Sequence, residues 1–177
     1  MALPTGPGGF LEFPRYTLPE FAYIARPDSL ILAPPTTTPE LMGRMEDAAA
    51  AMLESLPHTP VNGLGHNFEF RDPNPDAEKL AVFTEASQDL SDESPEGWSS
   101  ISTMIASSFR YANGSTIANI QRHFDGASII IKFNFHHPLT TVQQALQVLR
   151  GENGHARMSQ SFEIALNLLN NIYGVPQ

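Results

Sequence analysis

Hydrophobic and polar residues alternate along three neighbouring segments between residues 101 and 138, and two tight-turn dipeptides separate these segments. The dipeptides are Asn113-Gly114 and Asp125-Gly126. Both are typical of two-residue β-hairpin loops, because a type I′ turn requires positive φ at its two central residues. The pattern therefore predicts a three-stranded antiparallel meander.

Two-residue loops would also determine the register of the meander. Phe109 is then expected opposite Ala118 across the first loop, and Ala118 opposite Phe133 across the second. Because successive side chains of a strand point to opposite faces, this register separates an apolar face from a polar one. The apolar face, which we expect to be core, contains Ile105, Phe109, Tyr111, Ala118, Ile120, Phe124, Ile131, Phe133 and Phe135, with Ser107, Thr116 and Arg122 as polar exceptions.

The polar face of the predicted meander carries the candidate ligand- or partner-binding residues. These are Arg110, Lys132, Asn119, Asn134, Gln121 and His136. In the expected register two cross-strand rows lie side by side, one of Lys132, Asn119 and Ser108, the other of Asn134, Ile117 and Arg110.

The two cations of this face, Lys132 and Arg110, have no predicted carboxylate beside them, so they could hold a carboxylate or phosphate group. They could equally meet acidic residues of another segment or of another subunit. A solvated outer sheet face is the first interpretation, a partner or dimer interface the second, and a small-ligand site the third.

Outside the meander, the spacing of apolar residues and the capping signals predict further elements. They are a hairpin over residues 21–33, a helix from Thr38-Pro39 to Pro57, a strand over 61–70 with His66, Phe68 and Phe70 on one face, a helix that starts at Asn74-Pro75-Asp76, a mobile acidic loop over 88–97, and helices over 141–151 and 161–173. The order is β-β-α-β-α-β-β-β-α-α. Antiparallel hairpins with helices covering one apolar face indicate a two-layer α+β domain.

The first 20 residues differ in composition from the rest, because they hold four prolines and three glycines. We expect residues 1–20 to form a Pro/Gly-rich arm and residues 21–177 to form a single domain. A chain of 177 residues is long enough for one domain that buries about 70% of its unfolded surface.

Composition restricts the partners and the compartment. A net charge of −9 and a pI near 5.0 argue against nucleic acid as a partner, since nucleic acid requires a cationic surface. The sequence has no apolar run of membrane-spanning length and no basic, apolar leader at its start. The chain is therefore expected to be a soluble cytoplasmic protein with no membrane association.

Motifs for common chemistries are absent from the sequence. There is no cysteine, no H-E-x-x-H, no G-x-S-x-G, no S-x-x-K and no P-loop. His136 and His137 are adjacent in a strand, so their side chains point to opposite faces and cannot grip one ion together. We expect neither a cofactor nor a metal site, and enzymatic activity is the less favoured interpretation.

The combined pattern predicts a non-enzymatic interaction or accessory module that self-associates, with a protein or a second copy of itself as partner. The alternative is a small anionic-ligand-binding protein or a hydrolase that uses the polar sheet face. The mixed polar face and the aromatic residues of the arm motivate the first interpretation.

Overall fold

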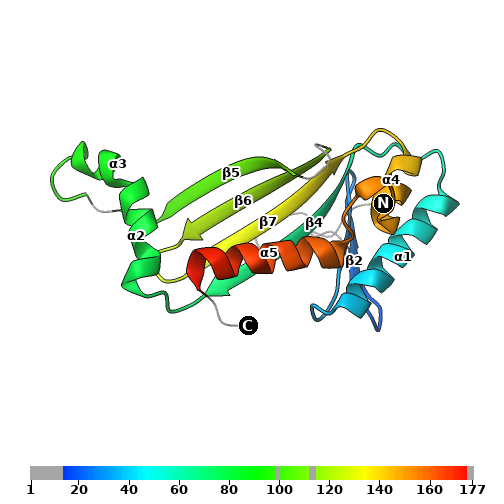
Figure 1. Ribbon diagram of the computed structural model, residues 1–177, viewed down its shortest axis with the longest axis horizontal. Coiled ribbons are helices and arrows are strands. Elements are labelled where there is room, and N and C mark those ends of the chain that lie inside the picture. The colour runs from blue at the N-terminus through cyan, green and yellow to red at the C-terminus, as the bar shows by residue number, and fades with distance from the viewer. Residues whose placement is uncertain (1–13, 99, 112–114, 175–177) are drawn as a thin grey trace.

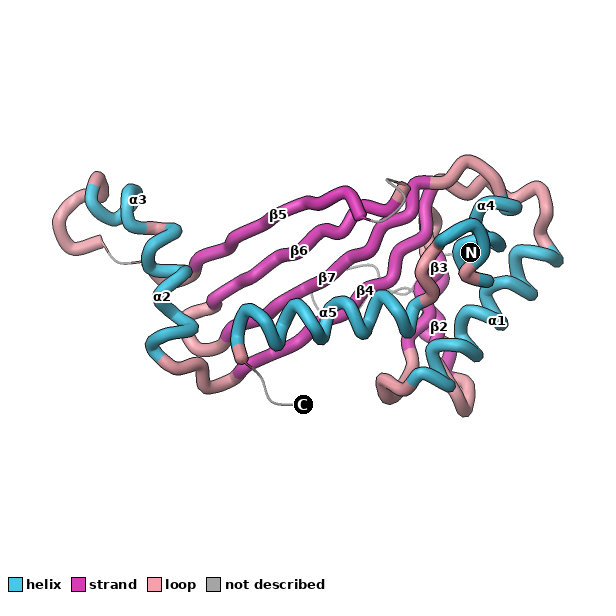
Figure 2. Tube along the Cα trace, in the orientation of Figure 1, coloured by secondary structure: helices cyan, strands magenta, loops and turns pink. Residues whose placement is uncertain are grey.

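The computed structural model describes residues 14–98, 100–111 and 115–174. These residues form two antiparallel sheets, of three and four strands, together with helices, which confirms the predicted α+β class. A long helix lies along one face of the four-stranded sheet, and two further helices stand with the three-stranded sheet at one end of it (Figures 1 and 2).

The elements follow one another in the order that the sequence predicts, with one additional strand at the start and two additional short helices, α3 and η1. They are β1 (Arg15–Thr17), β2 (Ala22–Ala25), β3 (Leu30–Ala33), α1 (Pro39–Ser55), β4 (Gly63–Asp72), α2 (Ala77–Ala86), α3 (Gln88–Asp92), β5 (Thr103–Tyr111), β6 (Thr116–Phe124), β7 (Ile129–Pro138), α4 (Val142–Arg150), the 3-10 helix η1 (Glu152–Gly154) and α5 (Met158–Tyr173).

The four-stranded sheet has the order β4-β7-β6-β5, so the predicted meander supplies three of its strands. Phe109 lies opposite Ala118, which confirms the register expected across the first loop. The dipeptide Asn113-Gly114 itself lies outside the described residues. Across the second loop Ala118 lies opposite Phe135 rather than Phe133, so that predicted register is wrong by two residues.

The side chain of Asp125 explains the two-residue shift. Its carboxylate accepts hydrogen bonds from the backbone N–H groups of Ala127 at 3.1 Å and Ser128 at 2.7 Å, which closes a four-residue loop. Gly126 takes the positive φ of 88° that the loop requires. Because the shift is an even number, every side chain keeps its predicted face.

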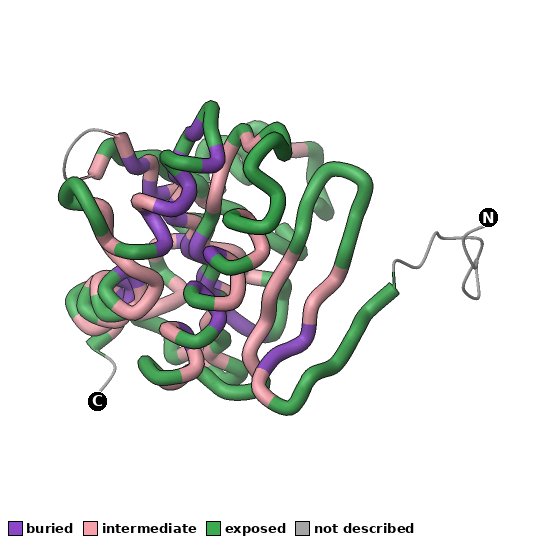
Figure 3. Tube along the Cα trace, turned by 90° about the vertical axis from the view of Figure 1, so that its right-hand side faces the viewer, coloured by how far each residue is buried: buried purple, intermediate pink, exposed green. Residues whose placement is uncertain are grey.

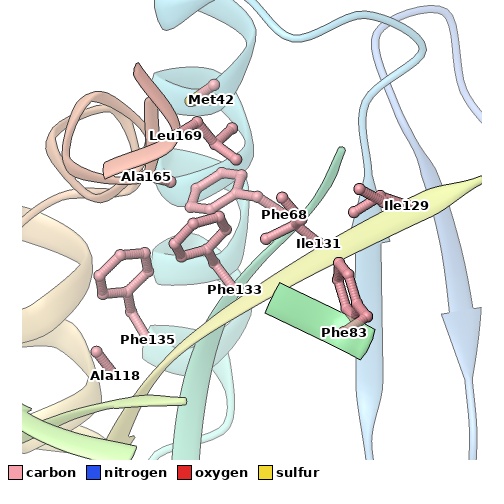
Figure 4. Close-up of a cluster of buried hydrophobic side chains, with 10 residues drawn as sticks. All are labelled: Met42, Phe68, Phe83, Ala118, Ile129, Ile131, Phe133, Phe135, Ala165 and Leu169. Atoms are coloured by element: carbon pink, nitrogen blue, oxygen red, sulfur yellow. The ribbon is translucent and has the colours of Figure 1, made fainter. Parts of the chain in front are cut away.

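The core lies between the sheet and α5. Phe133 and Phe135 of β7 and Phe68 of β4 are buried against the helix, as Figure 4 shows. The buried residues of α5 recur every four positions, at Ser161, Ala165 and Leu169, so one stripe of the helix faces the aromatic rings.

A second apolar cluster joins α1 and α4. Ala50 of α1 packs with Val142, Leu146 and Leu149 of α4. As predicted, Thr38 begins α1: its hydroxyl accepts a hydrogen bond from the N–H of Leu41 at 3.3 Å.

The predicted start of α2 at Asn74-Pro75-Asp76 is confirmed, because the Asp76 side chain caps the N–H of Lys79 at 2.9 Å and the helix begins at Ala77. Two other local expectations differ from the structure. The acidic segment expected as a mobile loop contains the short helix α3. Residues 15–17, inside the predicted arm, form β1 and pair with β2, where the rings of Tyr16 and Tyr23 stack 4.7 Å apart.

Burial differs between the two sheets. The buried parts of the chain gather in the interior, whereas β1, β2 and β3 form an outer layer that is buried mainly at its Phe21-Ala22 end (Figure 3). None of the helices in the described part of the chain is long and apolar enough to cross a membrane.

Two phenylalanines on the same face of the sheet test this packing. Phe133 is almost fully buried, whereas Phe109 is 54% exposed. We expect Phe133→Ala to lower the free energy of unfolding by about 3–5 kcal/mol, because it removes a ring and leaves a cavity. Phe109→Ala in dilute protein should cost less than about 1 kcal/mol. Urea titrations of the two variants measure the difference, and equal losses would contradict the described core.

Candidate functional site

The outer face of the four-stranded sheet carries a row of hydrogen-bonded side chains, one from each strand. Ser108 Oγ donates to Asn119 Oδ1 at 2.7 Å, and Asn119 Nδ2 donates to Asn134 Oδ1 at 3.0 Å. Asn134 Nδ2 then donates to Asn67 Oδ1 at 2.7 Å. The amides satisfy one another, so the row forms a continuous polar rib across the sheet.

The composition of this row corrects the predicted one. Asn119 lies opposite Asn134, not opposite Lys132, because of the same two-residue shift at the second loop. Lys132 instead lies opposite Gln121 of β6 on one side and Glu69 of β4 on the other.

The expectation that no carboxylate shares this face is wrong. Lys132 Nζ lies 3.3 Å from Glu69 Oε2, and the pair is possible because β4 joins the sheet beside β7. Both side chains are more than half exposed, so the ion pair contributes little to stability. It nevertheless balances the lysine charge that would have attracted an anion.

The remaining two candidates, Arg110 and His136, lie in a neighbouring row. Each faces Ile117, so the predicted row of Asn134, Ile117 and Arg110 is wrong in its β7 member. The His136 ring occupies the space above Gly63 of β4, where a Cβ would lie only 2.7 Å from its Cε1 atom. A glycine at this position therefore lets the ring lie across the neighbouring strand.

The other four candidates, Lys132, Asn119, Asn134 and Gln121, do come together, in an open pocket of about 290 Å³. Its polar lining consists of Asn67, Glu69, Asn119, Gln121, Lys132 and Asn134. The lining offers amides, one ammonium group and one carboxylate. It contains no hydroxyl or thiol nucleophile beside a base, which hydrolysis by covalent catalysis would require.

A buried polar cluster, which the sequence interpretation missed, lies on the opposite face of the sheet. His66 Nδ1 lies 3.1 Å from Ser161 Oγ, and His66 Nε2 lies 3.8 Å from Glu46 Oε1. The order serine, histidine, carboxylate is that of a hydrolytic triad.

Burial and geometry argue against catalysis by this cluster. Ser161, His66 and Glu46 all lie in the interior, so a substrate carbonyl has no access to the Ser161 hydroxyl. The 3.8 Å between His66 and Glu46 is too long for the hydrogen bond that orients a catalytic histidine. We interpret the cluster as structural.

Glu46 has a structural partner at the start of α5. Its carboxylate accepts hydrogen bonds from the Met158 N–H at 2.7 Å and from Arg157 Nε at 2.8 Å. Burial raises the pKa of Glu46, and these two hydrogen bonds and the Arg157 charge oppose the rise. A carboxylate of α1 thus caps the positive end of α5, which explains why α5 begins three residues before the predicted Ser161.

Two further histidines extend the cluster. The rings of His66 and His137 lie 5.2 Å apart, and those of His137 and His155 lie 5.7 Å apart. His137 Nδ1 lies 3.1 Å from Thr116 Oγ1. Among the described residues, no group of three or more His, Cys, Asp or Glu side chains is placed to hold a metal ion.

Both deeply buried rings have lowered basicity. Burial, and secondarily the neighbouring His137, lowers the pKa of His66 to about 3. Burial, and secondarily His155 and His136, lowers the pKa of His137 to about 4. Both imidazoles are therefore neutral at pH 7.

The sequence did contain signals for this cluster. His66 shares its strand face with Phe68, and His137 shares its face with Phe135, so alternation alone places both histidines in the core. Glu46 follows Met42 by four positions and thus lies on the apolar stripe of α1.

Comparisons of the chain with models of protein families, with curated proteins and with solved structures found no match.

The buried histidines should make the folded protein less stable in acid. The pKa values of His66 and His137 in the folded chain lie below the ordinary value of 6.5, so folding favours their neutral forms. Their contribution to stability is complete above pH 6.5 and is lost as the pH falls toward 4 and 3. At pH 5 the protonation of each histidine in the unfolded chain should lower the free energy of unfolding by about 2 kcal/mol.

Urea titrations at pH 7 and pH 5 measure this loss. His66→Gln removes one titrating ring, so it should reduce the difference between the two pH values by roughly half. His58→Gln, which changes an exposed histidine, is the matched control and should leave the difference unchanged. An unaltered difference in the His66 variant would contradict the assignment.

Proposed function

We propose that this chain is a non-enzymatic interaction module that self-associates by pairing β5 with β5 of a second copy. The observation that carries the proposal is the open edge of the larger sheet. Among the described residues β5 pairs with β6 alone, so this nine-residue strand forms an open edge of the sheet. Such an edge is a template for another strand.

The core face beside this edge is covered only in part. The long helix α5 lies over the β4 and β7 side of the sheet, and the shorter helix α2 contacts β5 (Figure 1). Phe109, on the helix-bearing face, is consequently 54% exposed. A second copy placed against β5 would cover part of that ring and remove apolar surface from water.

The residues of the edge lack the devices that usually prevent pairing. β5 contains no proline and no lysine, and Arg110 is its one charged residue. The opposite edge strand, β4, carries Glu69, Arg71 and Asp72. Of the two edges, β5 is therefore the one suited to strand pairing.

The sequence of β5 is complementary to itself when two copies pair antiparallel about Ser107. That register places Ile105 opposite Phe109 of the partner subunit on the apolar face, and Met104 opposite Arg110 of the partner subunit on the polar face. No like charges meet. A two-fold axis through Ser107 would join the two sheets into one, as an isologous interface requires.

The same geometry gives less support to an anionic ligand or a hydrolytic substrate. Lys132 of the polar pocket is balanced by Glu69, and the pocket lacks a nucleophile and base in contact. The polar face would instead be extended across the dimer as a broad surface of amides.

A charge at the two-fold axis tests the proposal. Ser107 is exposed, and in the proposed dimer it faces its own copy. We expect the wild-type chain to sediment as a dimer at high micromolar concentration. Ser107→Glu and Ser107→Lys should each weaken the dimer by about tenfold or more, because two like charges then face each other.

An equimolar mixture of the Glu and Lys variants should restore the dimer, since opposite charges then meet across the axis. Gln143→Glu adds the same charge at an exposed position of α4 and serves as the control. Analytical ultracentrifugation of each sample gives the result. A monomeric wild type would refute self-association, whereas a dimer indifferent to Ser107 would refute the β5 interface.

A further inference from the structure

The most exposed large apolar side chains among the described residues lie close together in the sequence. Ile101 is 81% exposed, Leu90 76%, Trp98 75% and Met104 61%. We call these four residues the end patch. Soluble chains seldom expose such a set without a binding role, because each side chain leaves apolar surface in water.

The end patch borders a pocket of about 350 Å³. Leu90, Trp98 and Met104 line it together with serine side chains, among them Ser87 and Ser91. The pocket lies where α2, α3 and the start of β5 meet, at the end of the sheet far from α1 and α4 (Figure 1).

The elements that carry the patch are anchored to the body of the protein. Phe83 of α2 is buried, and its ring lies 6.1 Å from that of Phe124 at the end of β6. Ser87, which connects α2 to α3, donates a hydrogen bond through its hydroxyl to the carbonyl of Phe83 at 2.9 Å. Core packing of Phe83 therefore holds α2 in place, and α3 follows directly after it.

The segment that carries the patch is acidic, although Arg122 and His123 of β6 lie opposite Ile105 and Met104. No lysine or arginine occurs between Lys79 and Arg110, whereas that interval contains Glu85, Asp89, Asp92, Glu93 and Glu96. None of these carboxylates forms an ion pair with a described residue. The patch thus combines apolar anchors with an excess of negative charge on its own segment.

We propose that the end patch binds a cationic amphipathic segment of another protein. Apolar side chains of the segment would enter the pocket beside Leu90 and Trp98, and its lysines or arginines would face the surrounding carboxylates. The charges would speed the encounter and make the affinity fall as salt rises.

The other possible occupants of this surface lack a charge complementary to it. A second copy would bring the same five carboxylates to the contact. Residues 1–13 of this chain contain Glu12 and no lysine or arginine, so they offer no complementary charge. Nucleic acid and anionic membranes would be repelled.

Trp98 is the only tryptophan of the chain, so its fluorescence reports on the patch alone. The probe is a helical peptide of leucines at positions i, i+3, i+4 and i+7 with lysines elsewhere, and without aromatic residues. Titration into the full-length chain should shift the Trp98 emission to the blue and saturate. A peptide of the same composition in scrambled order, and one with glutamates replacing the lysines, are the matched controls.

Two variants assign the contact to the patch. Leu90→Ser should lower the affinity for the peptide by about tenfold, because it removes an exposed apolar contact without disturbing the core. The double change Asp89→Asn with Glu93→Gln should lower the affinity for the peptide by a similar factor and make that affinity less dependent on salt. Leu30→Ser, at an exposed leucine of β3, should have no effect.

The titration is repeated in the Ser107→Glu chain, so that β5 pairing and peptide binding are judged separately. Equal binding there supports a site independent of the dimer, and loss of binding there would overturn that independence. No shift of Trp98 up to the solubility limit of the peptide would overturn the proposal. Equal shifts with the scrambled peptide, or with vesicles of zwitterionic lipid, would overturn it as well.

Discussion

The carboxylate of Glu46 determines where α5 begins, and much of the remaining structure depends on that position. It reaches from α1 to the first N–H of α5 and to Arg157, so the two helices are joined by charged hydrogen bonds inside the protein. α5 carries no serine, threonine or aspartate at its own N-cap, so a side chain from elsewhere satisfies the orphan donor. From this point α5 runs along β7 and β4 and buries their phenylalanines.

The same placement leaves part of the sheet uncovered. A single helix cannot cover all four strands, because neighbouring strands lie about 4.8 Å apart and a helix is about 10 Å wide. The covered strands alternate buried and exposed residues, whereas most residues of β5 are exposed. The exposed Phe109 and the open edge of β5 both follow from where α5 lies, and the proposed partner strand would cover both.

Local chemistry in the sequence predicted which face each side chain of the meander would take, but not which residues would be neighbours. The face depends only on alternation. The loop closed by Asp125 shifts the pairing of β6 and β7 by an even number of residues, so the predicted faces are correct although the predicted register is wrong. Glu69 could not be placed beside Lys132, because nothing in either strand specifies that β4 pairs with β7 rather than with β5. Similarly, the contact between Glu46 and Met158 joins positions 112 residues apart. Alternation could still have placed His66 in the core, since it shares a face with Phe68.

The two proposed surfaces differ in physical character, and their geometry relates them. Pairing at β5 relies on backbone hydrogen bonds and apolar contact, which salt screens little, whereas the end patch relies on unpaired carboxylates, which salt screens strongly. In an antiparallel β5 dimer, Thr103 of one copy lies beside Tyr111 of the partner subunit. The two end patches would then lie at opposite ends of the shared strand pair, about 30 Å apart for nine residues. A dimer of this kind presents two acidic apolar sites in a fixed arrangement, so a partner with two cationic segments at that spacing would bind more tightly than either segment alone.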